Sequence, residues 1–129
     1  MKLLLDTHAL LWWIQDGEQL SNRARVAIAD GGNQVLVSAA SVWEIAIKHR
    51  LGKLSIECED LASFVGEQIT LNGFEILEVS LSNAAFVAEL PLHHQDPFDH
   101  LLIAQAQVEQ ATLISKDGLF SQYDVPVLW

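Results

Sequence analysis

Short apolar segments alternate along this chain with segments that have the composition of helices. Residues 34–38, Q-V-L-V-S, are typical of a buried strand, and residues 39–50 continue as a helix that Gly52 ends. Because a helix separates each strand from the next, neighbouring strands run parallel and helices cover both faces of their sheet. We therefore predict an α/β fold with a central parallel sheet. The predicted strands are 2–5, 34–38, 74–79 and 112–115, with 123–129 as a candidate edge strand, and the predicted helices are 8–15, 21–30, 39–50, 61–71, 82–90 and 97–110.

Length and composition limit what this fold can be used for. A chain of 129 residues, half of them hydrophobic, is expected to form one domain, 1–129, with a sizeable core. Its formal net charge of −10 excludes a plain basic-patch nucleic-acid module. The single cysteine, Cys58, excludes an internal disulfide and a cysteine-only metal site. The apolar run 3–14 is interrupted at Asp6 and has no cleavage site after it, so we expect neither a signal peptide nor a membrane span, and a cytoplasmic location.

Four acidic residues occupy positions near the carboxyl ends of the predicted strands. Asp6 directly follows the first strand and Asp117 follows strand 112–115 by two residues, while Glu44 and Asp99 lie early in the helices 39–50 and 97–110. Parallel strands end at one edge of their sheet, where ligands bind in such folds, so we expect the four carboxylates to converge. Like charges held together need a cation to stay ionised. Oxygen ligands favour Mg²⁺ or Mn²⁺ over zinc, which prefers His or Cys.

A purely local explanation also applies to two of these acids, Asp6 and Asp117, and to the nearby Asp96. Asp6 and Asp96 stand where a helix N-cap is expected, and Asp96 is followed by a proline that suits the first turn. Asp117 precedes a glycine, a common turn pair. The sequence alone therefore leaves a cap or turn role open for each of them.

The two helical acids differ from each other. Glu44 follows Ser41 by three residues, as in a capping box, and precedes Lys48 by four, the favourable order for an ion pair. Asp99 has apolar residues three, four and seven positions later, so its carboxylate continues a buried helix face. A buried carboxylate needs a partner, and we expect a cation to be that partner.

The histidines and tryptophans carry weaker signals. His8, His93 and His94 lack the spacing of a helical metal-ligand pair, so we expect solvated or hydrogen-bonded roles for them. His49 and His100 stand beside polar neighbours and are expected to face water. We expect the tryptophans to pack in the core or at a subunit interface: Trp12, Trp13 and Trp43.

Four segments of the chain, taken together, match a known protein family far more specifically than any single acid does. They are L-L-L-D-T-H-A-L-L-W-W at 3–13, S-V-W-E-I-A-I-K-H-R-L-G-K-L at 41–54, D-P-F-D-H-L-L-I-A-Q-A at 96–106 and I-S-K-D-G-L-F at 114–120. In this order and spacing the chain resembles the PIN-domain proteins of the VapC-like group, the ribonuclease toxins of type II toxin–antitoxin systems. The resemblance runs nearly end to end and implies an α/β/α sandwich around a parallel sheet.

The resemblance also implies a function and a set of site residues. It implies a toxin that cleaves RNA phosphodiester bonds with a metal-activated water, binds a cognate antitoxin protein and forms a homodimer. Thr7 and Ser115 match positions whose hydroxyl groups support the acids, and Asp96 is a candidate for an outer position. His100 stands where many relatives have Arg. The residues implied to be catalytic and to bind one or two Mg²⁺ or Mn²⁺ ions are Asp6, Glu44, Asp99 and Asp117.

Other functions compatible with an acidic strand edge remain as alternatives. A different Mg²⁺-dependent phosphoesterase, such as a phosphatase, predicts release of phosphate from small monoesters. A signalling receiver domain requires an Asp closing a central strand, and strand 34–38 ends in Ser38 instead. A PIN-like binding module without catalysis is disfavoured because the set of four acids is complete.

Overall fold

A five-stranded parallel sheet forms the centre of the computed structural model, which describes residues 1–129. Its strand order is β3-β2-β1-β4-β5, so the first strand of the chain is the middle one. This confirms the parallel α/β fold, including the edge strand within 123–129. The strands are β1 (Lys2–Leu5), β2 (Gln34–Ser38), β3 (Glu75–Leu77), β4 (Thr112–Ile114) and β5 (Val127–Leu128).

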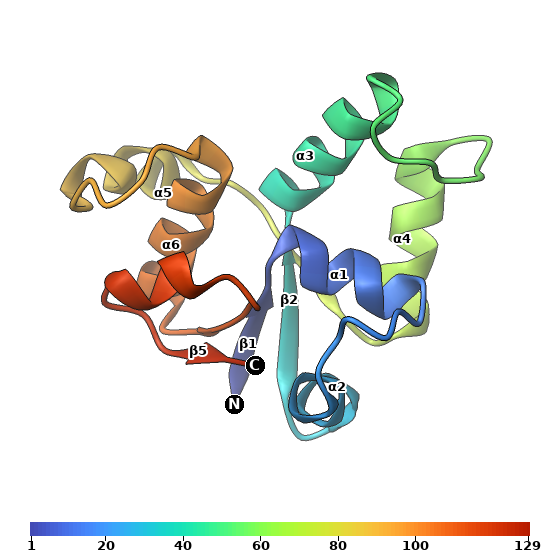
Figure 1. Ribbon diagram of the computed structural model, residues 1–129, viewed down its shortest axis with the longest axis horizontal. Helices are drawn as coiled ribbons and strands as arrows, with labels where there is room; N and C mark the ends of the chain where they lie inside the picture. The colour runs from blue at the N-terminus through green and yellow to red at the C-terminus, as the bar shows by residue number, and fades with distance from the viewer.

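Helices cover both faces of this sheet, as Figure 1 shows. Two short 3₁₀ helices, η1 (Val87–Glu89) and η2 (Gly118–Gln122), join the elements in the second half of the chain. None of the helices combines the length and the apolar composition that crossing a bilayer requires. The α-helices are α1 (Thr7–Ile14), α2 (Asn22–Ala29), α3 (Ala39–Arg50), α4 (Leu61–Leu71), α5 (Leu81–Phe86) and α6 (Pro97–Glu109).

The middle strand shows why the chain folds as two layers of helix around a sheet. Successive side chains of a strand point to opposite faces. Leu3 and Leu5 accordingly lie in one hydrophobic cluster with residues of α1, α2 and α3, while Leu4 lies in a second cluster with residues of α6. All three leucines are fully buried, which is the pattern of a strand covered on both faces.

The edge strands are shorter than the sequence predicts. We predicted a strand over 74–79, and β3 pairs only through Glu75–Leu77 because its single neighbour β2 ends at Ser38. Phe74 is instead buried in the first hydrophobic cluster. An edge strand hydrogen-bonds to one neighbouring strand only, so its paired length depends on where that neighbour ends as well as on its own residues.

The sheet register brings three strand ends level with one another. Leu5 of β1 pairs with Val37 of β2 and with Ile114 of β4. The chain enters α1 one residue after β1 ends and enters α3 directly after β2 ends. Residues just beyond these strands therefore share one edge of the sheet.

Candidate active site

A pocket of about 110 Å³ lies at this edge of the sheet. The structure brings all four predicted site acids together around it, from four separate segments of the chain. One cationic side chain, Lys48, also lines the pocket. Its lining residues are Asp6, Thr7, His8, Glu44, Lys48, Asp96, Asp99, Asp117 and Phe120.

Asp6 is the most deeply buried of the four acids, with 7% of its surface exposed. Its Oδ1 accepts a hydrogen bond of 2.7 Å from the amide of Ala9 and so caps α1. Burial raises the pKa of Asp6, and the charge of Asp117 adds to this, while hydrogen bonds from Ser115 and Ala9 and the charge of His8 oppose it. The cap and the pocket position are therefore compatible, because the cap occupies only part of the carboxylate.

Asp96 and Asp117 likewise act as caps while facing the pocket. Asp96 accepts hydrogen bonds from the amides of Phe98 and Asp99 at 2.9 and 3.2 Å, as its place before Pro97 predicts. Asp117 accepts one of 2.9 Å from the amide of Leu119 and begins η2. The local explanations left open by the sequence are thus confirmed, and both side chains still line the pocket.

Glu44 is held by two neighbours of different kinds. The hydroxyl of Thr7 donates to its Oε1 at 2.6 Å, and the ammonium group of Lys48 lies 2.9 Å from its Oε2. The ion pair with Lys48 is the one that the spacing predicts. The capping box with Ser41 does not form, because α3 begins at Ala39 and Ser38 is its cap.

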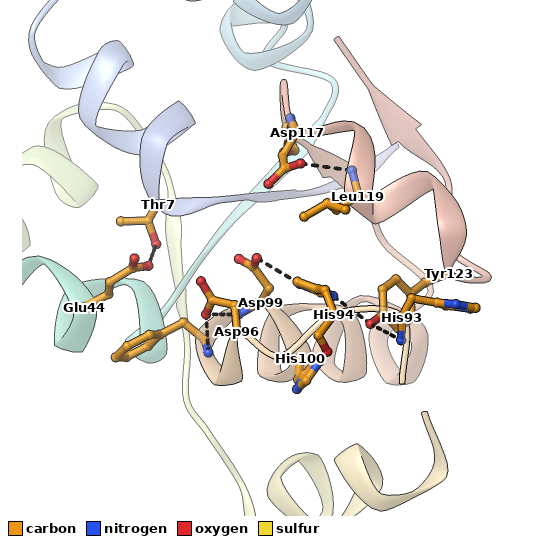
Figure 2. Close-up of polar contacts among 12 residues, drawn as sticks. Thr7, Glu44, His93, His94, Asp96, Asp99, His100, Asp117, Leu119 and Tyr123 are labelled. Atoms are coloured by element: carbon orange, nitrogen blue, oxygen red, sulfur yellow. Dashed lines mark hydrogen bonds and ion pairs between the residues drawn. The ribbon is translucent and has the colours of Figure 1, made fainter. Parts of the chain in front are cut away.

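Asp99 faces the pocket from the first turn of α6. Burial raises its pKa to about 6, with contributions from the charges of Asp96 and Asp117, while the hydrogen bond and charge of His94 oppose the shift. Its side chain is 20% exposed, in keeping with the apolar face predicted for it. Figure 2 shows the carboxylates of Asp99 and Asp117 directed toward each other across the pocket.

The partner of Asp99 in this structure is His94, for which the sequence predicted a solvated or hydrogen-bonded role, and the hydrogen-bonded role is confirmed. Nε2 of His94 lies 3.0 Å from Oδ2 of Asp99. The prediction that His100 faces water is wrong: it is 9% exposed, and its Nε2 lies 2.7 Å from the carbonyl oxygen of His94. Both contacts link α6 to the loop before it, and no spacing within the sequence signals them.

The four carboxylates supply the oxygen ligands that Mg²⁺ and Mn²⁺ prefer, so the donor chemistry fits such an ion. No group of three or more Asp, Glu, His or Cys side chains is arranged as a finished metal-ligand set. Each acid is hydrogen-bonded within the protein, and Glu44 in particular is held by Thr7 and Lys48. Carboxylates held around one pocket repel one another unless a cation compensates their charge.

The sequence matches the PIN domain family over residues 3–126. It is also similar to Ribonuclease VapC16 of Mycobacterium tuberculosis, at 42% identity over 64 residues. That match covers 50% of this chain and 45% of the relative, so less than half of the relative's length is matched.

The fold is similar to those of solved toxin–antitoxin complexes. VapBC2 from Rickettsia felis, bound to a DNA fragment from its promoter, gives a TM-score of 0.75 at 18% identity, over 100% of this chain and 99% of that one. FitAcB from Neisseria gonorrhoeae gives 0.66 at 22% identity, over 98% of this chain and 96% of that one. At these identities the similarity concerns the fold.

Proposed function

This chain belongs to the PIN domain family, and from that premise we propose that it is a metal-dependent endoribonuclease, the toxin of a type II toxin–antitoxin system acting in the cytoplasm. The observation that carries the proposal is the pocket at the carboxyl edge of the sheet, where the four acids of the family pattern line one cavity. The similarity to a protein named Ribonuclease VapC16 supports the nuclease activity. The toxin–antitoxin complexes of similar fold support the toxin role.

We assign the metal site to the four pocket acids, with Asp96 in an outer position. The residues that hold Mg²⁺ or Mn²⁺ in this proposal are Asp6, Glu44, Asp99 and Asp117. An ion held there would lower the pKa of a water molecule, neutralise charge on the phosphate during cleavage, and give the pocket of this acidic protein the positive charge that an RNA phosphate requires.

Neighbouring groups orient the pocket carboxylates and balance part of their charge. Thr7 fixes one oxygen of Glu44, so the orientation of that carboxylate does not depend on the metal. Lys48 balances part of the negative charge at the pocket and presents an ammonium group where a phosphate would approach. The caps at Asp6 and Asp117 tie two further carboxylates to the backbone beyond β1 and β4. No side chain of the pocket has to act as a nucleophile.

The decisive test is cleavage of RNA by the purified protein with and without a divalent cation. We expect a labelled single-stranded RNA to be cut internally with Mg²⁺ or Mn²⁺, and cutting to stop in excess EDTA and return when the ion is restored. Cleavage that continues in EDTA would contradict the metal-dependent mechanism. Release of phosphate from a small monoester without RNA cleavage would favour the phosphatase alternative.

We propose two protein partners, a cognate antitoxin and a second copy of this chain. Trp12 and Trp13 pack against the first hydrophobic cluster, whereas Trp43 is 60% exposed and packs edge-on against Phe98, at 5.1 Å between ring centres. Trp43 precedes the pocket residue Glu44, and an exposed tryptophan is typical of a protein interface. Trp43 is therefore the tryptophan that we expect a partner to cover.

An antitoxin is expected to silence the pocket with a cationic side chain. Arg pairs bidentately with carboxylates, so an Arg of the partner at Asp6 and Asp99 would compete with the metal ion. We expect co-expression with the neighbouring gene product to give a complex without RNA cleavage. We expect the cationic side chain to come from a basic C-terminal tail of the partner. Replacing the basic residues of that tail by Ala should weaken binding by about tenfold or more and make it less sensitive to salt. Full inhibition with unchanged affinity would show that the partner acts elsewhere.

A further inference from the structure

The loop before α6 places the ring of His94 between two side chains that come from distant parts of the chain. Its Nε2 lies 3.0 Å from Oδ2 of Asp99, and its Nδ1 lies 2.7 Å from Oη of Tyr123. Its side chain is 11% exposed. Figure 2 shows the ring standing between the two partners, with Tyr123 on the side away from the pocket.

The chemistry of these groups gives each hydrogen bond one direction. An ionised Asp99 carboxylate only accepts, so Nε2 of His94 carries the hydrogen. In a neutral imidazole Nδ1 is then an acceptor, so the hydroxyl of Tyr123 donates to it. Oη of Tyr123 in turn accepts the backbone N–H of His93, at 3.3 Å. The network is satisfied by a single tautomer of His94.

Two further contacts anchor this network in the protein. Tyr123 is 5% exposed and belongs to the second hydrophobic cluster, which packs α6 against the sheet. The ring of His100 donates to the carbonyl oxygen of His94 at 2.7 Å and so fixes the backbone of the loop. The position of His94 is therefore set by the core and not by solvent.

We infer that His94 is a positioning residue: it holds Oδ2 of Asp99 and thereby directs Oδ1 of Asp99 into the pocket for the metal ion, with Tyr123 fixing the His94 tautomer. This inference rests on the proposed metal-dependent function. Oδ1 makes no hydrogen bond within the chain, and Asp99 lines the pocket. The terminal torsion of an aspartate is broad, so without His94 the carboxylate would rotate and lose this direction. Outer partners of this kind typically change metal affinity by about 10- to 100-fold.

Mn²⁺ affinity of the full chain, measured by calorimetry, tests this role directly. We expect His94→Leu to weaken Mn²⁺ binding by roughly 10- to 100-fold, and His94→Gln, whose amide can still donate to Asp99, to stay within about threefold of wild type. Tyr123→Phe removes only the hydroxyl and should give an intermediate loss. His93→Leu is the matched control, because only the backbone of His93 hydrogen-bonds within the network. The His93 ring packs edge-on against Tyr123, at 4.9 Å between ring centres, and Leu keeps an apolar side chain there, so this variant should bind Mn²⁺ like wild type.

A second measurement needs no substitution at His94. Side-chain ¹⁵N NMR of the wild-type protein should show a protonated Nε2 and a non-protonated Nδ1 for His94, and Tyr123→Phe should lose this single tautomer. Thermal melting of each variant checks that it is folded. A hydrogen on Nδ1 of neutral His94, or wild-type Mn²⁺ affinity in a folded His94→Leu, would overturn the inference.

The same titrations separate this inference from the function on which it rests. Loss of Mn²⁺ binding in Asp99→Asn but not in His94→Leu would overturn the positioning role and leave the metal site intact. A wild-type protein that binds no Mn²⁺ would overturn both.

Discussion

Replacing Asp6 or Asp99 by Asn is expected to slow RNA cleavage by about 100-fold or more, because in the proposed mechanism each variant loses a charged ligand of the metal ion. Asn is nearly isosteric, and its amide oxygen can still accept the hydrogen bond from the Ala9 amide or from His94. The fold and the cap should therefore survive the change. Single-turnover cleavage rates of purified proteins in Mg²⁺ measure the effect, and growth arrest on expression should disappear in parallel.

Asp60→Asn provides the matched control for this experiment. Asp60 caps α4 by accepting from the amide of Ser63 at 3.3 Å, but it does not line the pocket. The same chemical change at a cap outside the pocket should leave the cleavage rate within about twofold of wild type, because Asn is also a favoured cap and no pocket residue is altered. Equal cleavage by wild type, Asp6→Asn and Asp99→Asn would refute the assignment of the site.

The fold and the acidic edge could be predicted because their signals are local. Three consecutive leucines predict the strand β1, and the structure buries all three. In a parallel sheet the residue that follows such a strand lies at the edge where ligands bind. Caps are local as well, which is why Asp96 before Pro97 was predicted as the cap of α6. The apolar spacing after Asp99 predicted its sheltered position for the same reason.

The contacts of the acids could not be predicted, because they depend on residues far away in the sequence. Tyr123 meets His94 across 29 positions, and Thr7 meets Glu44 across 37. His100 has polar neighbours in sequence, yet the loop before α6 folds back over it and buries it. For Asp99 the sequence predicted a partner but not its kind, and in this structure the partner is His94.

Stability without a divalent cation should change with pH in a way that identifies the pocket acids. The pKa of Asp99 is raised from 3.8 to about 6 in the folded protein, so between these pH values the folded state binds more protons than the unfolded state. The free energy of unfolding therefore falls as pH rises through this window and stays at its lower value above pH 6. The pKa of Asp6 is also raised, so its ionisation lowers the free energy of unfolding in the same direction.

Asn cannot ionise, so Asp6→Asn and Asp99→Asn remove the loss of stability that comes from ionising a buried carboxyl group. In EDTA at pH 7 we expect each variant to melt above wild type, for Asp99→Asn by a few degrees, corresponding to roughly 1 kcal/mol after allowing for its partial exposure. Below about pH 3, where the wild-type carboxyl groups are protonated in both the folded and the unfolded state, the advantage should vanish. Thermal melts in EDTA from about pH 3 to pH 7 measure the difference.

Adding Mn²⁺ should reverse the order of the melting temperatures of wild type and the two Asn variants. An ion that binds only the folded state stabilises it by about 2.7 kcal/mol at 100 times its dissociation constant, so the melting temperature of wild type should rise with Mn²⁺ concentration. The Asn variants have lost a ligand charge and should gain far less, so that wild type becomes the more stable protein. This crossing separates a metal ligand from a cap, because a cap stabilises the fold whether or not the ion is present. If Asp6→Asn in EDTA melts well below wild type at pH 7, the ionised carboxylate of Asp6 stabilises the metal-free fold, and the repulsion between pocket carboxylates on which this prediction depends is refuted.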